Sequence, residues 1–129
     1  MGWSKLVAED FTHVHAPESQ QHPVLLPNTE REFIKKMIND ELQELSESES
    51  VLDQQDAFVD MIYYLLDTGA KNGWNLDPLF YMVHEANIRK IEQGVVKKDG
   101  KVQKPEGWEG PDKQHEEILK RHEIYGSWA

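Results

Sequence analysis

The sequence has no cysteine among its 129 residues. A disulfide framework and a zinc site built from thiolates are therefore excluded, and the chain fits a reducing compartment. Long apolar runs are also missing, since none approaches the ~20 residues that a transmembrane helix needs, and no signal peptide is visible. We therefore expect a soluble, cytoplasmic protein without a membrane partner.

Positive charge is scarce. The 24 acidic residues outnumber the 14 basic ones and give a formal net charge of −10. This balance argues against a protein whose main task is to bind nucleic acid or an anionic membrane. An anionic small molecule remains possible if a cation mediates the contact.

The size and composition fit a single domain that spans residues 1–129. Hydrophobic residues make up 38% of the chain, which is enough for a core and too much for a disordered tail. A domain this small often gains stability by self-association.

Apolar spacing and end signals predict the first helices. One covers residues 3–14 and stops before Pro17, and a connector with several prolines follows it. Thr29 and Glu32 have the spacing of a capping box, which predicts the start of a second helix. The polar SESES stretch, residues 46–50, ends that helix.

The rest of the chain predicts three more helices and a hairpin. One helix contains residues 57–66 and ends at Gly69 or Gly73, where glycine suits a left-handed cap. The next runs from Pro78 to about residue 93 with Asp77 as its N-cap, and the last covers residues 112–125. Asp99-Gly100 predicts a turn inside a β-hairpin-like segment, residues 95–104. We therefore expect an all-α bundle of four to five helices with this short β-hairpin-like excursion.

Residues 40–70 contain nine acids and no lysine or arginine. Their simplest interpretation is a solvated acidic face. These acids are Asp40, Glu41, Glu44, Glu47, Glu49, Asp53, Asp56, Asp60 and Asp67.

Helix geometry favours a different interpretation for some of these acids. At ~100° per residue, Glu41 lies near the centre of the apolar stripe formed by residues 34, 37, 38, 42 and 45, so it should face inward. On the next helix Asp56, Asp60 and Asp67 share one strip. Like charges that converge need raised pKa values or a bound cation, and oxygen ligands favour Mg²⁺, with Mn²⁺ as a substitute.

Two other kinds of metal site are excluded because the chain lacks the ligands that they need. A di-iron bundle uses Glu-x-x-His pairs on two helices, and this chain has none. His84-Glu85 begins like a zinc protease signature, but Ile88 stands where the second histidine would be.

Five features in order carry a family resemblance: the proline-broken N-terminal connector, DELQE at 40–44, DAFVDMIYY at 56–64, VHEANIRK at 83–90 and DGKVQKP at 99–105. Together they resemble the all-α nucleoside triphosphate pyrophosphohydrolases, the superfamily that includes MazG and phosphoribosyl-ATP pyrophosphohydrolase. The resemblance implies that Glu41, Glu44 and Asp60 bind Mg²⁺ and that Asp40 or a neighbouring carboxylate orients or activates water.

One position departs from the family pattern. The glutamate of the family's ExxD signature falls at position 57, which is alanine here. Asp56, one residue earlier, is the substitute ligand that we predict, because a four-residue spacing still places it on the same face as Asp60. The alternative is that Asp56 is an outer or surface residue.

Substrate-side residues are predicted further along the chain. Asn87 and Lys90 point to the apolar side of their helix, where a triphosphate would explain them, although Lys90 could instead extend to solvent and Asn87 could bond backbone. Lys101 and Lys104 could close over phosphates or belong to a plain solvent loop. Trp108 could stack on a base or serve in packing.

The favoured hypothesis is Mg²⁺-dependent hydrolysis of a nucleoside triphosphate to a monophosphate and pyrophosphate. One alternative is hydrolysis of phosphoribosyl-ATP, and another is a non-enzymatic helical protein with an acidic docking face. The resemblance also implies a homodimer or a homotetramer.

Overall fold

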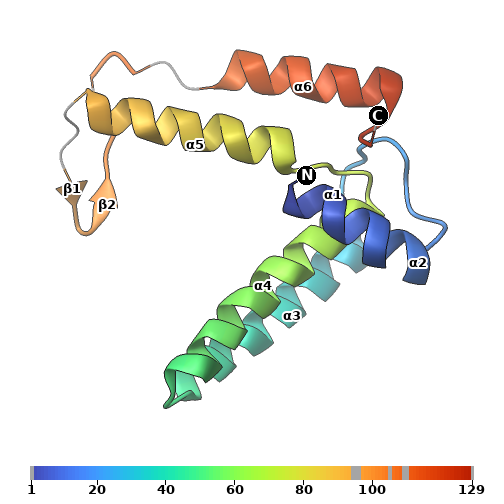
Figure 1. Cartoon of the computed structure of the whole chain (residues 1–129), viewed down its shortest axis with the longest axis horizontal. Helices are drawn as coiled ribbons and strands as arrows, with labels where there is room; N and C mark the ends of the chain where they lie inside the picture. Colours follow the sequence, from blue (N-terminus) through green and yellow to red (C-terminus); the bar gives the residue numbers. More distant parts are fainter. Residues whose placement is uncertain (1, 94–96, 105, 109–110, 129) are drawn as a thin grey trace.

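The computed structural model in Figure 1 describes residues 2–93, 97–104, 106–108 and 111–128. Its first helical unit, residues 3–15, consists of α1 (Trp3–Val7), the π-helical turn η1 (Ala8–Thr12) and α2 (His13–His15), which follow one another without a break. We call this unit the N-terminal helix. It ends before Pro17, as predicted, because proline cannot continue the helical hydrogen bonding.

A long antiparallel hairpin of α3 (Asn28–Glu47) and α4 (Val51–Lys71) forms an arm that projects from the rest of the molecule (Figure 1). The Ser/Glu stretch separates the two helices, and Ser50 caps α4 by accepting a hydrogen bond of 3.1 Å from the backbone N–H of Asp53. The predicted capping box at Thr29 is wrong. Pro27 occupies the cap position with an extended backbone, so Thr29 already lies inside the first turn.

The second hairpin consists of α5 (Asp77–Glu92) and α6 (Asp112–Tyr125), which lie side by side (Figure 1). Between them β1 (Lys97–Lys98) pairs with β2 (Lys101–Val102) in antiparallel register. Asp99 and Gly100 have φ values of 54° and 76°, which are the two left-handed residues of a tight hairpin turn. The predicted all-α fold with one short β-hairpin is therefore confirmed.

The two hairpins meet at the start of α5, where Asp77 has a different role from the predicted N-cap. Its carboxylate accepts hydrogen bonds from the backbone N–H groups of Ser4, at 2.9 Å, and Lys5, at 3.1 Å, and so caps α1. In return the Ser4 hydroxyl accepts a hydrogen bond of 2.9 Å from the Leu76 N–H. The N-termini of α1 and α5 therefore cap each other, and this fixes the angle between the helices.

Most buried residues lie around this junction. Ala8, Thr12 and Ala70 pack where the N-terminal helix crosses the end of α4. The C-terminal segment joins them, because the backbone N–H of Ser127 donates to the Gln21 carbonyl and its hydroxyl donates to the Gly73 carbonyl.

The arm and α5 leave many apolar side chains uncovered in the single chain. Phe58 on α4 is 57% exposed and Phe80 on α5 is 70% exposed. Leu42, which the sequence predicts to face inward, is 45% exposed. The other large apolar residues exposed on these two helices are Val51, Leu52, Val59, Ile62, Tyr63, Leu65, Tyr81, Val83, Ile88 and Ile91.

Within the described ranges, no helix combines the length and the apolar character that a membrane span requires.

Candidate active site

Glu41 is the one acid of the arm whose side chain is buried. It is 7% exposed, and its Oε2 atom has no hydrogen-bond partner. This burial confirms the prediction that Glu41 faces inward from α3. A buried carboxylate oxygen without a partner is costly, so the position indicates a missing ligand or a bound proton.

The surroundings of Glu41 raise the pKa of its carboxyl above the usual range. Burial is the largest cause, and the negative charges of Glu44, Asp60 and Asp40 add to it. The structure therefore brings α3 and α4 together so that their acids act on one buried group. We call Glu41, Glu44 and Asp60 the carboxylate cluster.

Asp60 and Asp56 on α4 differ in their direction relative to α3. Ala57 is 2% exposed and marks the side of α4 that packs on α3. At ~100° per residue Asp60 lies ~60° from the direction of Ala57, whereas Asp56 lies ~100° from it. Asp56 is exposed, and among the causes that raise the Glu41 pKa Asp60 appears and Asp56 does not.

The remaining predicted catalytic acids lie at the surface of α3. Glu44 is exposed, one turn beyond Glu41. Asp40 is also exposed, and its Oδ2 atom accepts a hydrogen bond of 3.1 Å from Lys36 Nζ. Asp40 is therefore near the cluster and partly neutralised by its own helix.

The cluster has the donor chemistry of a hard-cation site without a finished coordination geometry. Its ligands are all carboxylate oxygens, and one of them is buried and unpaired. In the described part of the chain, no three acidic or histidine side chains stand close enough together to hold a metal ion. Glu44 and Asp60 are exposed, so their rotation toward Glu41 would cost little packing.

The predicted substrate-side residues gather near the end of α5. Lys90 Nζ donates a hydrogen bond of 3.2 Å to Asn87 Oδ1. The Lys90 ammonium also lies 5.6 Å from the ring centroid of Trp108. Lys101 and Lys104 are exposed, on β2 and just after it. In the single chain, α5 packs on α6 and on the N-terminal helix, and these residues are not gathered around Glu41.

Sequence reasoning missed the partners of two groups. Arg89 also lies over Trp108, with its guanidinium carbon 5.7 Å from the ring centroid. Asp67 accepts hydrogen bonds from the Thr12 hydroxyl, at 2.6 Å, and pairs with His15 Nε2 at 2.9 Å. The sequence placed Asp67 on the acidic strip of α4. It could not predict Thr12 and His15 as the partners of Asp67, because these contacts depend on how the N-terminal helix packs on α4.

An all-α hairpin with a buried acid on one helix and a neighbouring acid on the other is consistent with the nucleoside triphosphate pyrophosphohydrolase superfamily that includes MazG. The family model of phosphoribosyl-ATP pyrophosphohydrolase matches residues 8–87, which is more than half of the chain. The chain belongs to the phosphoribosyl-ATP pyrophosphohydrolase family. A comparison with curated proteins finds no match.

Family membership supports a nucleotide pyrophosphohydrolase activity. Enzymes of this superfamily generally use divalent metal ions, which agrees with the donor chemistry of the carboxylate cluster. The matched range includes all the predicted acidic residues and Asn87, and it ends before Lys90, Lys101, Lys104 and Trp108.

Proposed function

We propose that the protein hydrolyses a nucleoside triphosphate, canonical or modified, to the monophosphate and pyrophosphate in a Mg²⁺-dependent reaction. The observation that carries this proposal is the buried Glu41 carboxyl, whose Oε2 atom has no hydrogen-bond partner, with Glu44 and Asp60 raising its pKa from the two helices of the arm. Family membership supports the same class of reaction.

In this proposal Glu41, Glu44 and Asp60 hold the cation, with Mn²⁺ as the substitute for Mg²⁺. When bound, the cation offsets the charge of the phosphates and lowers the pKa of a coordinated water. The packing of α3 on α4 that buries Glu41 excludes solvent from one side of the site. Asp40 orients water from the rim of the site, and its ion pair with Lys36 offsets part of the negative charge of Asp40.

We place Asp56 outside the ligand set of the single chain, because it points further from α3 than Asp60 does and is not among the groups that raise the Glu41 pKa. This placement supports the alternative role as an outer residue. Position 57 points toward α3, and its alanine leaves the cluster one carboxylate short of the family's pattern.

The substrate contacts in the proposal come from α5 and the segment that follows it. Lys90, Lys101 and Lys104 supply positive charge to the phosphates, and the hydrogen bond from Lys90 holds the amide of Asn87 in place. Residues 89–104 contain six basic and two acidic residues, so this segment is the basic counterpart of the acidic arm. Trp108 supplies an aromatic surface next to Lys90 and Arg89.

We also propose that residues 1–129 act as one domain and that a second copy of the chain covers the arm. Soluble monomers rarely expose contiguous apolar surface of the kind found on α4 and α5. Pairing of two arms would build a homodimer, or a homotetramer from two such dimers. Sedimentation velocity at several concentrations tests this, and a monomer at micromolar concentration would contradict it.

The test of the activity is pyrophosphate release from a panel of canonical and modified dNTPs, NTPs and phosphoribosyl-ATP, with Mg²⁺ or Mn²⁺. We expect Asp60→Asn and Glu41→Gln to lower kcat at least about 100-fold, as expected when a group that stabilises transition-state charge is lost. The matched control is Glu47→Gln, because Glu47 is an exposed acid of α3 that only accepts from Gln43.

Two outcomes would overturn the proposal. Pyrophosphate release by Asp60→Asn at the rate of the unaltered protein would refute the assignment of the cluster. A protein that releases no pyrophosphate from any member of the panel would instead favour the acidic arm as a docking face for a basic protein.

A further inference from the structure

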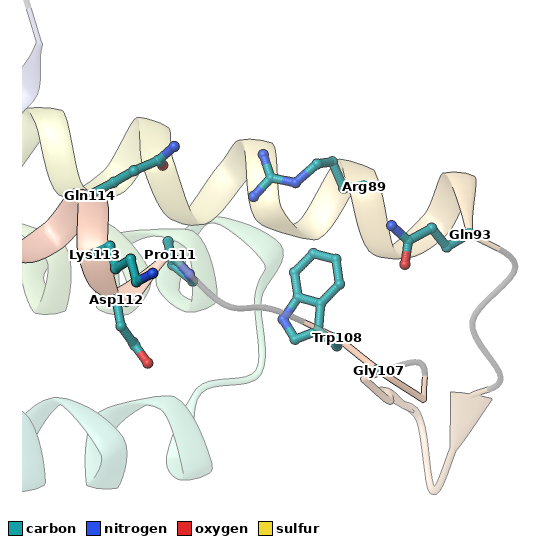
Figure 2. Close-up of a pocket in the computed structure, with 8 residues that line it drawn as sticks. All are labelled: Arg89, Gln93, Gly107, Trp108, Pro111, Asp112, Lys113 and Gln114. Carbon is teal, nitrogen blue, oxygen red and sulfur yellow. The ribbon is translucent and has the colours of Figure 1, made fainter.

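A cavity lies beside the end of α5, between that helix and the start of α6 (Figure 2). Its volume is about 720 Å³, and Arg89, Gln93, Trp108, Asp112, Lys113 and Gln114 line it. Figure 2 shows Arg89 and Gln93 extending from α5 beside the indole of Trp108, with Asp112 and Lys113 coming from the first turn of α6. None of the acids of the carboxylate cluster belongs to this lining.

The aromatic part of the cavity is suited to a flat ring. The Arg89 guanidinium carbon lies 5.7 Å from the centroid of Trp108, at the outer limit of a cation–π contact. A planar ring inserted between guanidinium and indole needs about 3.5 Å on each side, or about 7 Å in total. A shift of the flexible Arg89 side chain by roughly 1 Å therefore opens a stacking slot.

The polar groups of the cavity suit the edge of a base better than a polyphosphate. Arg89 and Lys113 are donors, Asp112 is an acceptor, and the amides of Gln93 and Gln114 offer both functions. A carboxylate such as Asp112 would repel a phosphate group, whereas it accepts a hydrogen bond from an amino or imino group. The cations that suit phosphates, Lys90 and Lys101, lie outside the lining.

We propose that this cavity binds the nucleobase of the substrate, stacked on Trp108, and that its lining determines which bases the enzyme accepts. The proposal rests on the proposed function and adds to it the place where the base is read. Trp74, the other tryptophan near α5, donates its Nε1–H to the Val24 carbonyl and serves the fold.

The test separates recognition of the base from recognition of the phosphates. Loss of a base-stacking aromatic weakens binding by roughly 5- to 150-fold, so Trp108→Ala should raise the KM for a good nucleotide substrate by about that factor. Trp108→Phe should recover most of the affinity. Inorganic tripolyphosphate, which has no base, should inhibit all three proteins with the same Ki. The matched control is Lys120→Ala, which removes an exposed cation of α6 outside the lining.

The outcomes are distinguishable from failure of the activity itself. Equal weakening of nucleotide and tripolyphosphate by Trp108→Ala would mean a structural role and would overturn the proposal, as would an unchanged KM. Equilibrium dialysis with a nucleoside monophosphate measures the same contact without turnover. If the unaltered protein proves inactive, tighter monophosphate binding by it than by Trp108→Ala still supports the cavity, and equal binding refutes it.

Discussion

The sharpest prediction compares two aspartates one turn apart on α4. Both side chains are exposed, but Asp60 raises the pKa of the buried Glu41 carboxyl, whereas Asp56 points further from α3 and is not among the causes of that shift. Asp60→Asn removes a charge that repels Glu41, so it should raise the melting temperature of the protein without divalent cation. It should also remove about half of the stabilisation that Mg²⁺ provides, and Asp56→Asn should do neither.

The size of the effect follows from the chain length and mass action. For 129 residues the unfolding entropy is about 0.27 kcal/mol/K, so 1 kcal/mol corresponds to about 4 °C. A cation present at 100 times its Kd stabilises the folded state by about 2.7 kcal/mol, or about 10 °C. If the loss of one ligand weakens binding tenfold, the gain falls to about 1.4 kcal/mol, or about 5 °C.

Differential scanning fluorimetry of the three proteins, with EDTA and along a Mg²⁺ series, provides the measurement. Protein concentration is kept fixed, because the melting temperature of an oligomer depends on it. The reasoning fails if Asp60→Asn keeps the full Mg²⁺ gain, or if Asp56→Asn loses as much as Asp60→Asn. The second result would mean that Asp56 turns inward when the cation binds.

Three further predictions concern the arm, the junction and pH. Ala57→Glu should destabilise the cation-free protein by about 1–3 kcal/mol, because the larger side chain overpacks the site and its charge repels Glu41. The added carboxylate should also lower the Kd for Mg²⁺ measured by calorimetry. An unchanged Kd would contradict the inward direction of position 57. Asp77→Ala should cost about 2 kcal/mol in urea unfolding because two backbone donors of α1 lose their acceptor, whereas the exposed Asp112→Ala should cost much less; equal losses would refute the reciprocal caps. Burial, followed by the Arg121 charge, lowers the pKa of His122 below its usual 6.5. As the pH drops, the unfolded chain therefore binds a proton at His122 before the folded chain does. The contribution of His122 to the free energy of unfolding is fully present above pH 6.5 and is lost as the pH falls below it. His122→Gln should make the loss between pH 7.5 and 5.5 smaller, and an identical pH profile would refute this account.

Local patterns were sufficient to predict the helices. Pro17 predicted the end of the N-terminal helix, and the SESES stretch and the glycines at 69 and 73 placed the C-terminal ends of α3 and α4 within about two residues of the observed ones. The Asp99-Gly100 turn was equally readable, since its two left-handed residues follow from residue type alone. The inward direction of Glu41 also came from spacing, because α3 and α4 are neighbours in sequence and pack along their whole length.

Contacts between distant segments were not readable in the same way. Asp77 has the residue type and position of an N-cap, yet its carboxylate caps α1 instead, because the fold brings Ser4 to it across 73 residues of sequence. The same limit applies to Asp67, whose hydrogen bonds with Thr12 and His15 depend on how the N-terminal helix crosses α4. The spacing of residues along one helix predicts the direction in which a side chain points. Which group that side chain contacts depends on the element that packs against the helix.

This distinction also explains why the single chain presents the proposed site in two parts. The carboxylate cluster belongs to a hairpin whose helices pack on each other, and the substrate-side residues belong to a second hairpin that joins it at the α1–α5 caps. The exposed apolar faces of α4 and α5 are large enough to be covered by a second copy of the chain. When two chains pair through these faces, the acidic arm of one chain can meet the basic segment of the other. In that arrangement the apolar faces hold the dimer, and substrate binding requires the dimer. A charge reversal such as Lys101→Glu changes none of these apolar side chains, so it should weaken nucleotide binding while leaving the dimer intact, whereas Phe58→Asp should disrupt both.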